Sequence, residues 1–273
     1  MTETQNPWDV LLRSWLHDPV DKAADIRGHF SRAVRYASIV LGYEVTEQEL
    51  KGGFADQRAS AYERLPIPDA RGNYEELGVQ PGAQGELTII HPLSARASEI
   101  RVPLREREVR ALLAEMFSPE MDARRRFLKL WRCVPGRMAE FEPGYARQPA
   151  ETRNPDHTIW QHLDTTSAMA WAMEGGAGAA ALLSFKLGPV QPFIEAARSM
   201  RDLLTGSYLL STLAFAAIKP ILKSCGPTAL VYPALRGLPV MDEWLIKEVG
   251  LDWAKPTPES LLRPALPHRF LAL

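Results

Sequence analysis

The chain has 273 residues, a formal net charge of −1, and an ordinary balance of 46% hydrophobic and 24% charged residues. This length can bury one large core or two modest ones, and two domains are the better expectation. The near-neutral charge excludes a global attraction to nucleic acid, so any polynucleotide contact must come from local patches. Two distant cysteines, Cys133 and Cys225, argue against a disulfide framework or a four-cysteine zinc site and fit a reducing cytoplasm.

The first predicted helix begins at Asn6-Pro7, with asparagine as the cap, and ends before Pro19, which disfavours helical geometry at the preceding residue. His17 and Asp18 fall at this helix end. A carboxylate there faces the negative end of the helix dipole, and a bound cation or Lys22 would stabilise it.

The remaining pattern up to residue 155 predicts helices joined by irregular segments and one hairpin. A capping box at Thr46 and Glu49 opens one of the helices. Basic residues interleaved with aromatics near residues 124–132 favour a solvated helix face over a nucleic-acid surface. The expected elements are a helix over 21–41 carrying His29, a helix from 46, a loop over 66–86, a hairpin of 87–93 with 99–104, helices over 105–133, and an irregular connection over 135–155.

A second histidine pair lies in the segment NPDHTIWQHLD, residues 154–164. His157 and His162 are five positions apart and would point about 140° away from each other on an uninterrupted helix. If Thr158 is the N-cap and Gln161 closes a capping box, the two histidines take the positions that meet in a hydrophobic staple. Both imidazoles are then expected to face a single ion.

A Gly/Ala-rich linker over 175–181 places the domain boundary between residues 176 and 177. The segment that follows predicts a strand over 179–187, a turn at Gly188-Pro189 and a helix over 190–204. Gly206-Ser207 is predicted to break the helix, leaving backbone N–H groups that can receive phosphate. The second helix, 208–222, is too short to span a bilayer, so we expect a soluble chain. A strand over 229–233, a helix over 241–249 and renewed strand character at 270–273 complete the pattern.

Long contiguous motifs carry a family resemblance. The runs GPVQPFIEAARSMRDLLTGSYLLS, GPTALVYPALRGLPVMDEWL and LPHRFLAL resemble the first palm domain of the large, polymerase-like subunit of type III-B CRISPR effector complexes, the Cmr type. Upstream, LLRSWLHDPVDKAADIRGHFSRAVRYA resembles that family's N-terminal HD nuclease domain. The resemblance implies an α+β chain: a mostly helical HD-type domain over 1–176, then an incomplete ferredoxin-like palm domain over 177–273.

The resemblance implies a metal-dependent nuclease that acts on single-stranded DNA, with His17 and Asp18 as catalytic residues. The expected metal ligands are His17, Asp18, His29, His157 and His162. Imidazole and carboxylate ligands suit Mn²⁺, Ni²⁺, Fe²⁺ or Zn²⁺, and Mn²⁺, Ni²⁺ or Mg²⁺ is the expected cofactor. By spacing alone, a His-Asp dipeptide occurs readily by chance.

The family also binds ATP between two palm domains and makes cyclic oligoadenylate once target RNA is bound. The positions that match this site are Gly188, Gln191, Arg198, Arg201, Asp202, Gly206 and Ser207. Packing is an equally good explanation for these residues. The sequence contains no Gly-Gly-Asp-Asp motif, so synthesis is expected only with a second palm domain.

The partners implied by the resemblance are the guide-RNA-containing subunits of the complex, single-stranded DNA and, indirectly, target RNA. A prokaryotic cytoplasmic location without a membrane is expected. Renewed strand character at 270–273 suggests one part of a longer polypeptide. Two alternatives remain open: a stand-alone HD phosphohydrolase that acts on a nucleotide, and a non-catalytic scaffold subunit of the RNA-guided complex.

Overall fold

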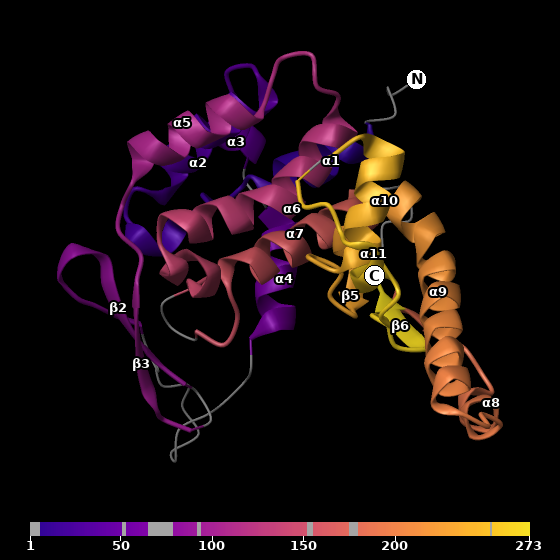
Figure 1. Cartoon of the computed structure of the whole chain (residues 1–273). Helices are drawn as coiled ribbons and strands as arrows, with labels where there is room; N and C mark the ends of the chain where they lie inside the picture. Colours follow the sequence, from indigo (N-terminus) through magenta and orange to yellow (C-terminus); the bar gives the residue numbers. More distant parts are fainter. Residues whose placement is uncertain are drawn as a thin grey trace. The chain divides into compact units, whose positions relative to one another are not determined.

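A computed structural model describes residues 6–50, 53–64, 79–91, 94–151, 155–174, 180–251 and 253–273. The chain divides into two compact units, unit 1 (Met1–Glu174) and unit 2 (Gly175–Leu273), two residues from the predicted boundary. Figure 1 follows the chain from unit 1, in indigo and magenta, to unit 2, in orange and yellow. Mixed helix and sheet agree with the predicted α+β class.

Unit 1 is mostly helical. Its apolar stripes meet in a core that includes Leu11, Trp15, Phe127 and Leu163, all nearly inaccessible to solvent. The helices of unit 1 are α1 (Pro7–Trp15), α2 (His29–Leu41), α3 (Glu47–Leu50), α4 (Gly53–Glu63), α5 (Glu106–Met116), α6 (Ala123–Phe141) and α7 (Ile159–Glu174), with 3-10 turns η1 (Lys22–Ala24), η2 (Ala83–Gly85) and η3 (Pro143–Arg147).

Helix α7 organises this core because α1 and α4 both pack against it. Asp164 on α7 accepts hydrogen bonds from two indole N–H groups, Trp15 Nε1 at 2.9 Å and Trp131 Nε1 at 3.2 Å. Farther along α7, the Ser167 hydroxyl donates to the carbonyl oxygen of Leu11 at 3.1 Å. These bonds fix the register of α1 against α7 and so determine which residue lies opposite the end of α1.

The predicted hairpin is present as β2 (Glu86–Ile90) and β3 (Ala97–Arg101), and Figure 1 shows it at the edge of the helical unit. A further strand, β1 (Val79–Pro81), pairs antiparallel with β2. The predicted loop over 66–86 is therefore wrong at its end, and residues 65–78 lie outside the described part.

Two helix boundaries in unit 1 differ from the prediction. Residues 21–41 do not form one helix, because the Asp25 carboxylate accepts from the backbone N–H of Arg27 at 3.1 Å and turns the chain before α2. The irregular connection expected over 135–155 starts later than predicted, because α6 continues through Pro135 to Phe141. Burial of Val134 and Met138 on either side outweighs a proline cost of about 3 kcal/mol.

The basic run on α6 is partly structural. Arg126 is buried and donates hydrogen bonds to the main-chain carbonyl oxygens of Val40, Ser118, Pro119 and Met121. Its guanidinium therefore satisfies carbonyl oxygens at the end of α2 and in the segment between α5 and α6. Arg126 is not part of a solvated face.

Unit 2 begins with β4 (Leu183–Lys186) and ends with β6 (Arg269–Ala272), which pairs antiparallel with both β4 and β5 (Leu230–Tyr232). The sheet order β4-β6-β5 makes β4 and β5 parallel with β6 between them. This is the split β-α-β arrangement found in ferredoxin-like folds. The ferredoxin-like palm itself stays a prediction. The helical parts of unit 2 are α8 (Val190–Glu195), α9 (Met200–Ser224), η4 (Pro227–Ala229), α10 (Pro239–Val249) and α11 (Pro258–Leu261).

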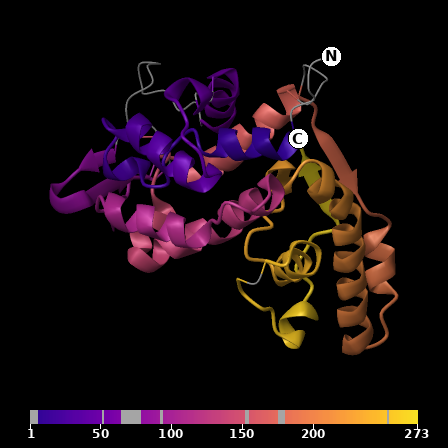
Figure 2. The same cartoon turned by 90° about the horizontal axis from the view of Figure 1, so that it is seen from above.

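Helix α9 is one continuous helix, so the predicted break at Gly206-Ser207 is wrong. A Cβ atom on Gly206 would lie 3.2 Å from Cε1 of Phe193, so the glycine allows α8 to pack closely on α9. Figure 2 shows α8 beside the long α9, both in orange. Among the described residues, α9 alone has the length and hydropathy of a membrane-crossing helix. This is weak evidence for a membrane span, because core helices of soluble proteins can have the same length and hydropathy.

Candidate functional site

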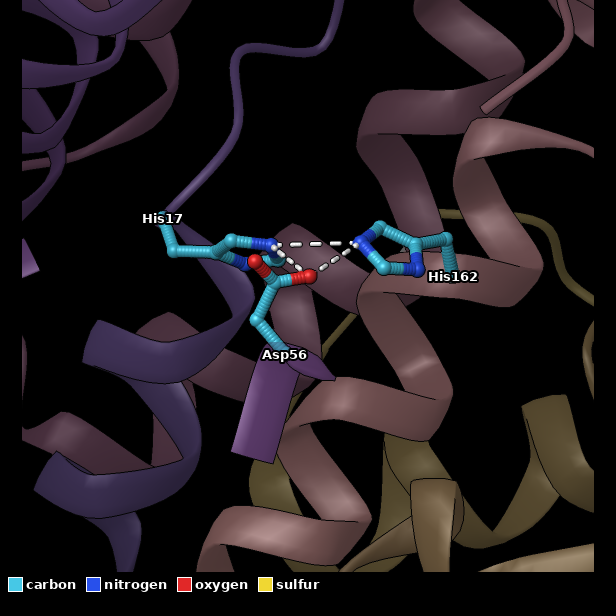
Figure 3. A group of neighbouring side chains, drawn as sticks. All are labelled: His17, Asp56 and His162. Atoms are coloured by element: carbon cyan, nitrogen blue, oxygen red, sulfur yellow. Dashed lines mark hydrogen bonds and ion pairs between the residues drawn. The ribbon is translucent and has the colours of Figure 1, made fainter. Parts of the chain in front are cut away.

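A cluster of four side chains forms where α1, α4 and α7 meet. His17 and Asp18 follow the end of α1, Asp56 lies on α4 and His162 lies on α7. Three of them are buried, and about 41% of the Asp56 side chain is exposed. Figure 3 shows His17, Asp56 and His162 pointing toward one another.

The donor atoms of this cluster converge. Nε2 of His17 lies 3.3 Å from Nε2 of His162, and Oδ1 of Asp56 lies 3.8 Å and 3.2 Å from these two nitrogens. Oδ2 of Asp18 lies 3.4 Å from Nε2 of His17 and 3.7 Å from Nε2 of His162. Donors about 2.1 Å from a single ion are separated by roughly 3.0–3.5 Å. The His17–His162, His17–Asp18 and His162–Asp56 distances fall in this range, and the other two are slightly longer. His17, Asp56 and His162 are together close enough to hold a metal ion.

The local sequence explains the placement of His162. The capping box at the start of α7 is present as predicted: the backbone N–H of Thr158 donates to Oε1 of Gln161 at 2.8 Å, and the Gln161 N–H donates to Oγ1 of Thr158 at 3.4 Å. The rings of His157 and His162 are consequently 6.1 Å apart between centroids. Both rings lie next to the same oxygen of Glu63, but only His162 is part of the four-residue cluster.

The last turn of α4 supplies that oxygen. Oε2 of Glu63 accepts from Nδ1 of His162 at 2.9 Å and lies 3.4 Å from Nε2 of His157. Asp156 in turn accepts from Nδ1 of His157 at 2.6 Å. Asp156, His157 and Glu63 have side chains 9% exposed or less, so the chain of alternating carboxylates and imidazoles is buried.

His29 lies at the side of the cluster. Its Nε2 is 3.9 Å from Oδ1 of Asp18, and its Nδ1 is hydrogen-bonded to the Ile26 carbonyl oxygen at 2.5 Å. Lys22 binds the other oxygen of Asp18 at 2.5 Å. Without an ion, the ammonium group supplies the positive charge next to Asp18. Among the predicted ligands, the structure brings His17, Asp18 and His162 together and leaves His29 and His157 outside this cluster. His157, His162 and Glu63 form a second group of close donor atoms. Metal binding by the five predicted ligands stays a prediction.

The two clustered histidines have opposite proton affinities. Burial lowers the pKa of His17, while Nδ1 of this ring is held by the Ser14 carbonyl oxygen at 2.6 Å. Burial by itself would lower the pKa of His162, but hydrogen bonds to Asp56 and Glu63 and the charges of Glu63 and Asp18 outweigh it and raise the pKa to about 9. A protonated His162 therefore donates from Nδ1 to Glu63 and from Nε2 to Asp56 in the metal-free chain.

The two carboxylates of the cluster stay ionised. Burial would raise the pKa of Asp18, yet the charges of His17 and Lys22 together lower it. Burial also opposes ionisation of Asp56, but contacts with His162 and His17 lower the pKa of Asp56 to about 2. Both carboxylates thus carry the negative charge that a divalent cation requires.

A cavity of about 580 Å³ opens beside Asp56 and His162. Its lining combines apolar groups such as Ile26 with the cationic side chains of Lys22, Arg27 and Arg64. Arg64 is held by Glu151 through two bonds of 2.8 and 2.7 Å. The lining can therefore contact both polar and apolar groups of a small ligand that lies beside the cluster.

A second hollow, of about 390 Å³, lies between α8 and the first turns of α9. Its lining includes Arg198, Arg201, Asp202 and Gly206, four of the residues predicted to bind a nucleotide. The first-turn N–H of Asp202 already donates to Oγ of Ser199 at 3.1 Å. An anion in this hollow would therefore contact the arginine side chains.

The other three predicted nucleotide residues do not line this hollow. Gly188 lies in the turn between β4 and α8, and Ser207 lies within α9. The Gln191 amide donates to Glu195 at 3.0 Å on the same short helix. The role of all seven residues in binding ATP stays a prediction.

Comparisons with known proteins find similar chains of one kind. Residues 182–273 match the family model described as CRISPR-associated protein Cmr2, N-terminal. The chain is 27% identical to the CRISPR system Cmr subunit Cmr2 of Pyrococcus furiosus, over 95% of this chain and 34% of that protein. Over most of its length this chain is similar to Cmr2.

Another Cmr2, from Saccharolobus solfataricus, is 39% identical over 34% of this chain and 9% of its own length. A solved structure described as the apo state of a type III-B Cmr-beta complex has a TM-score of 0.66 and 20% identity, covering 97% of this chain and 29% of its own. The resemblance to the type III-B large subunit is thereby confirmed. The chain spans about a third of the length of the Pyrococcus relative.

The sequence alone did not indicate Asp56 or Glu63 as site residues. Both lie on one face of α4, seven positions apart, but the buried residues of this helix are only Ala55 and Ala59. The one sequence signal for Asp56 and Glu63 is their spacing of two helical turns on a weakly apolar helix. This spacing is also common on solvated helices, so it does not indicate a site.

Proposed function

We propose that this chain hydrolyses phosphodiester bonds in single-stranded DNA at the cluster of His17, Asp18, Asp56 and His162. The convergence of donor atoms of His17, Asp56 and His162 from three helical segments, with Asp18 beside His17, carries this proposal. Two imidazole nitrogens and two carboxylate oxygens are a donor set that suits Mn²⁺ or Ni²⁺. Such an ion, when bound, polarises a phosphoryl oxygen and lowers the pKa of a water molecule.

The residues of this chain prepare the site for that chemistry. Asp18 and Asp56 supply negative charge, and the lone pair of His17 Nε2 is aimed into the cluster because Nδ1 binds the Ser14 carbonyl. Lys22 and Arg27 at the rim of the cavity would attract the phosphate groups of a strand. A cavity of about 580 Å³ has room for one nucleotide of a single strand.

We further propose that the chain acts within a type III-B complex, together with subunits that hold guide RNA. Its similarity to proteins described as subunits of CRISPR Cmr systems supports this assignment. Target RNA would act indirectly through that assembly. A scaffold role and a stand-alone nucleotide hydrolase are the alternatives that the following experiment distinguishes.

The experiment incubates the chain with labelled single-stranded DNA and Mn²⁺, and compares His17→Ala and Asp56→Ala with His91→Ala, a histidine outside the cluster. We expect cleavage by the wild type and by His91→Ala, and a loss of at least about 100-fold in the two cluster variants. Absence of cleavage with every divalent metal would favour the scaffold. Turnover of mononucleotides alone would favour the nucleotide hydrolase.

The hollow between α8 and α9 supports a second function, half of an ATP site. Arg198 and Arg201 offer two cationic groups beside the apolar surface of Phe193 and Ile194, a combination that can hold phosphates and a base. Isothermal titration with ATP tests this: we expect weak binding that Arg198→Ala/Arg201→Ala abolishes and Lys247→Ala preserves. Binding unchanged in the double variant would leave the two arginines with a packing role.

A further inference from the structure

The carboxylate of Glu63 occupies a buried position between two imidazoles. Its Oε2 accepts from Nδ1 of His162 at 2.9 Å and lies 3.4 Å from Nε2 of His157. Only 6% of the Glu63 side chain is exposed, and within the described part of the chain its Oε1 has no hydrogen-bond partner. The carboxylate is therefore held by the Nδ1–H of His162 and lies next to the ring of His157.

This contact determines which nitrogen of His162 faces the candidate metal site. Because Nδ1 donates its proton to Glu63, Nε2 is the nitrogen directed at His17 and Asp56, at 3.3 and 3.2 Å. A histidine binds a metal through a deprotonated nitrogen, and the partner of the other nitrogen fixes the tautomer and the ring orientation. Glu63 supplies that partner from the helix that also carries Asp56.

The two histidines of the cluster are oriented in different ways. The Nδ1 partner of His17 is a main-chain carbonyl, that of Ser14, which belongs to the same helical end. The Nδ1 partner of His162 is a side chain from another helix, and a carboxylate strengthens the imidazole as a donor more than a carbonyl does. His162 therefore depends on α4 for its orientation, and His17 does not.

We infer that Glu63 is a positioning residue that sets the tautomer and orientation of His162 for metal binding. His157 and Asp156 extend the same network: Asp156 accepts from Nδ1 of His157, whose Nε2 faces Glu63. This inference rests on the proposed metal-dependent function. It gives His157, a predicted ligand, a place in the network around Glu63.

The test measures Mn²⁺ binding to the full chain by isothermal titration calorimetry. Glu63→Ala is expected to raise the dissociation constant about 10- to 100-fold. Glu63→Gln, whose amide oxygen can still accept from Nδ1, should have a smaller effect and guards against misfolding of the alanine variant. Glu106→Gln is the matched control, because that carboxylate binds Arg35 at 2.6 and 3.1 Å on other helices.

A second readout distinguishes positioning from general stability. Nitrogen-15 NMR of the six histidines reports which ring nitrogen carries the proton after Mn²⁺ is replaced by diamagnetic Zn²⁺. We expect His162 to be protonated at Nδ1 in the wild type and in Glu106→Gln, and to lose this single tautomer in Glu63→Ala. Equal Mn²⁺ affinity and an unchanged tautomer in folded Glu63 variants would overturn the inference. A wild type that binds no divalent ion would instead overturn the proposed function itself.

Discussion

At the scale of single residues, His162 has the clearest consequence for stability. Its pKa is raised to about 9 in the folded chain by contacts with Asp56 and Glu63 that outweigh burial. A group whose pKa is raised on folding stabilises the protein fully below its unfolded pKa of about 6.5, and this contribution is lost as the pH rises toward 9. One unit of pKa corresponds to about 1.4 kcal/mol, so the full effect is on the order of 3 kcal/mol.

We therefore predict that the free energy of unfolding of the metal-free chain decreases between pH 6.5 and pH 9. Urea titrations in a chelator measure it, and the difference between the wild type and His162→Gln removes the contributions of other titrating groups. His91→Gln serves as the control and should retain the wild-type slope. If His162→Gln showed the same pH dependence as the wild type, the charge that we assign to His162 in the metal-free state would be wrong.

At the scale of elements, the contact between α1, α6 and α7 depends on Asp164. Its two oxygens accept from the indole N–H groups of Trp15 and Trp131, whose side chains are almost fully buried. Removing the carboxylate leaves buried donors without these partners, at about 1–3 kcal/mol each. It also loosens the register that places His17 opposite His162.

We predict that Asp164→Ala lowers the free energy of unfolding by about 2–5 kcal/mol, measured by circular dichroism in urea. Asp164→Asn keeps one acceptor oxygen and should lose less than the alanine variant. A change below about 0.5 kcal/mol in Asp164→Ala would show that the tryptophans, and not their shared acceptor, hold the three helices together.

The elements also explain how far the sequence was informative. His17 and Asp18 could be placed because Pro19 ends α1, and the histidine pair on α7 because the Thr158 capping box has a recognisable spacing. Their meeting depends on tertiary contacts such as those of Asp164, which no local pattern contains. Asp56 and Glu63 were missed for the same reason. They become site residues only because α4 packs against α7, and this contact is not visible in the local sequence.

Local rules failed where packing overrides backbone preference. Gly206 and Pro135 both suggest a helix end, yet each lies within a continuous helix. In α9 the glycine is needed because Phe193 of α8 approaches so closely. The predicted phosphate-binding turn therefore disappears, while Arg198 and Arg201 still line a common hollow.

At the scale of the whole molecule, the division into two units separates the two candidate sites. The metal-ligand cluster belongs to unit 1 and the hollow with the two arginines to unit 2. Each unit has buried residues of its own, such as Phe127 and Leu163 in unit 1 and Phe215 and Met241 in unit 2. A ligand that binds only one folded unit stabilises that unit by RT ln(1 + [L]/Kd), about 2.7 kcal/mol at 100 times Kd.

We predict that Mn²⁺ raises the melting temperature of unit 1 and leaves that of unit 2 unchanged when the full chain is heated in a differential scanning calorimeter. The unit 1 transition is identified by His17→Ala, in which Mn²⁺ should no longer shift it. For a unit of this size, 2.7 kcal/mol corresponds to a shift of roughly 5–10 °C. A single transition that shifts as a whole would mean that the two units unfold as one, and a Mn²⁺ shift that persists in His17→Ala would place the ion elsewhere.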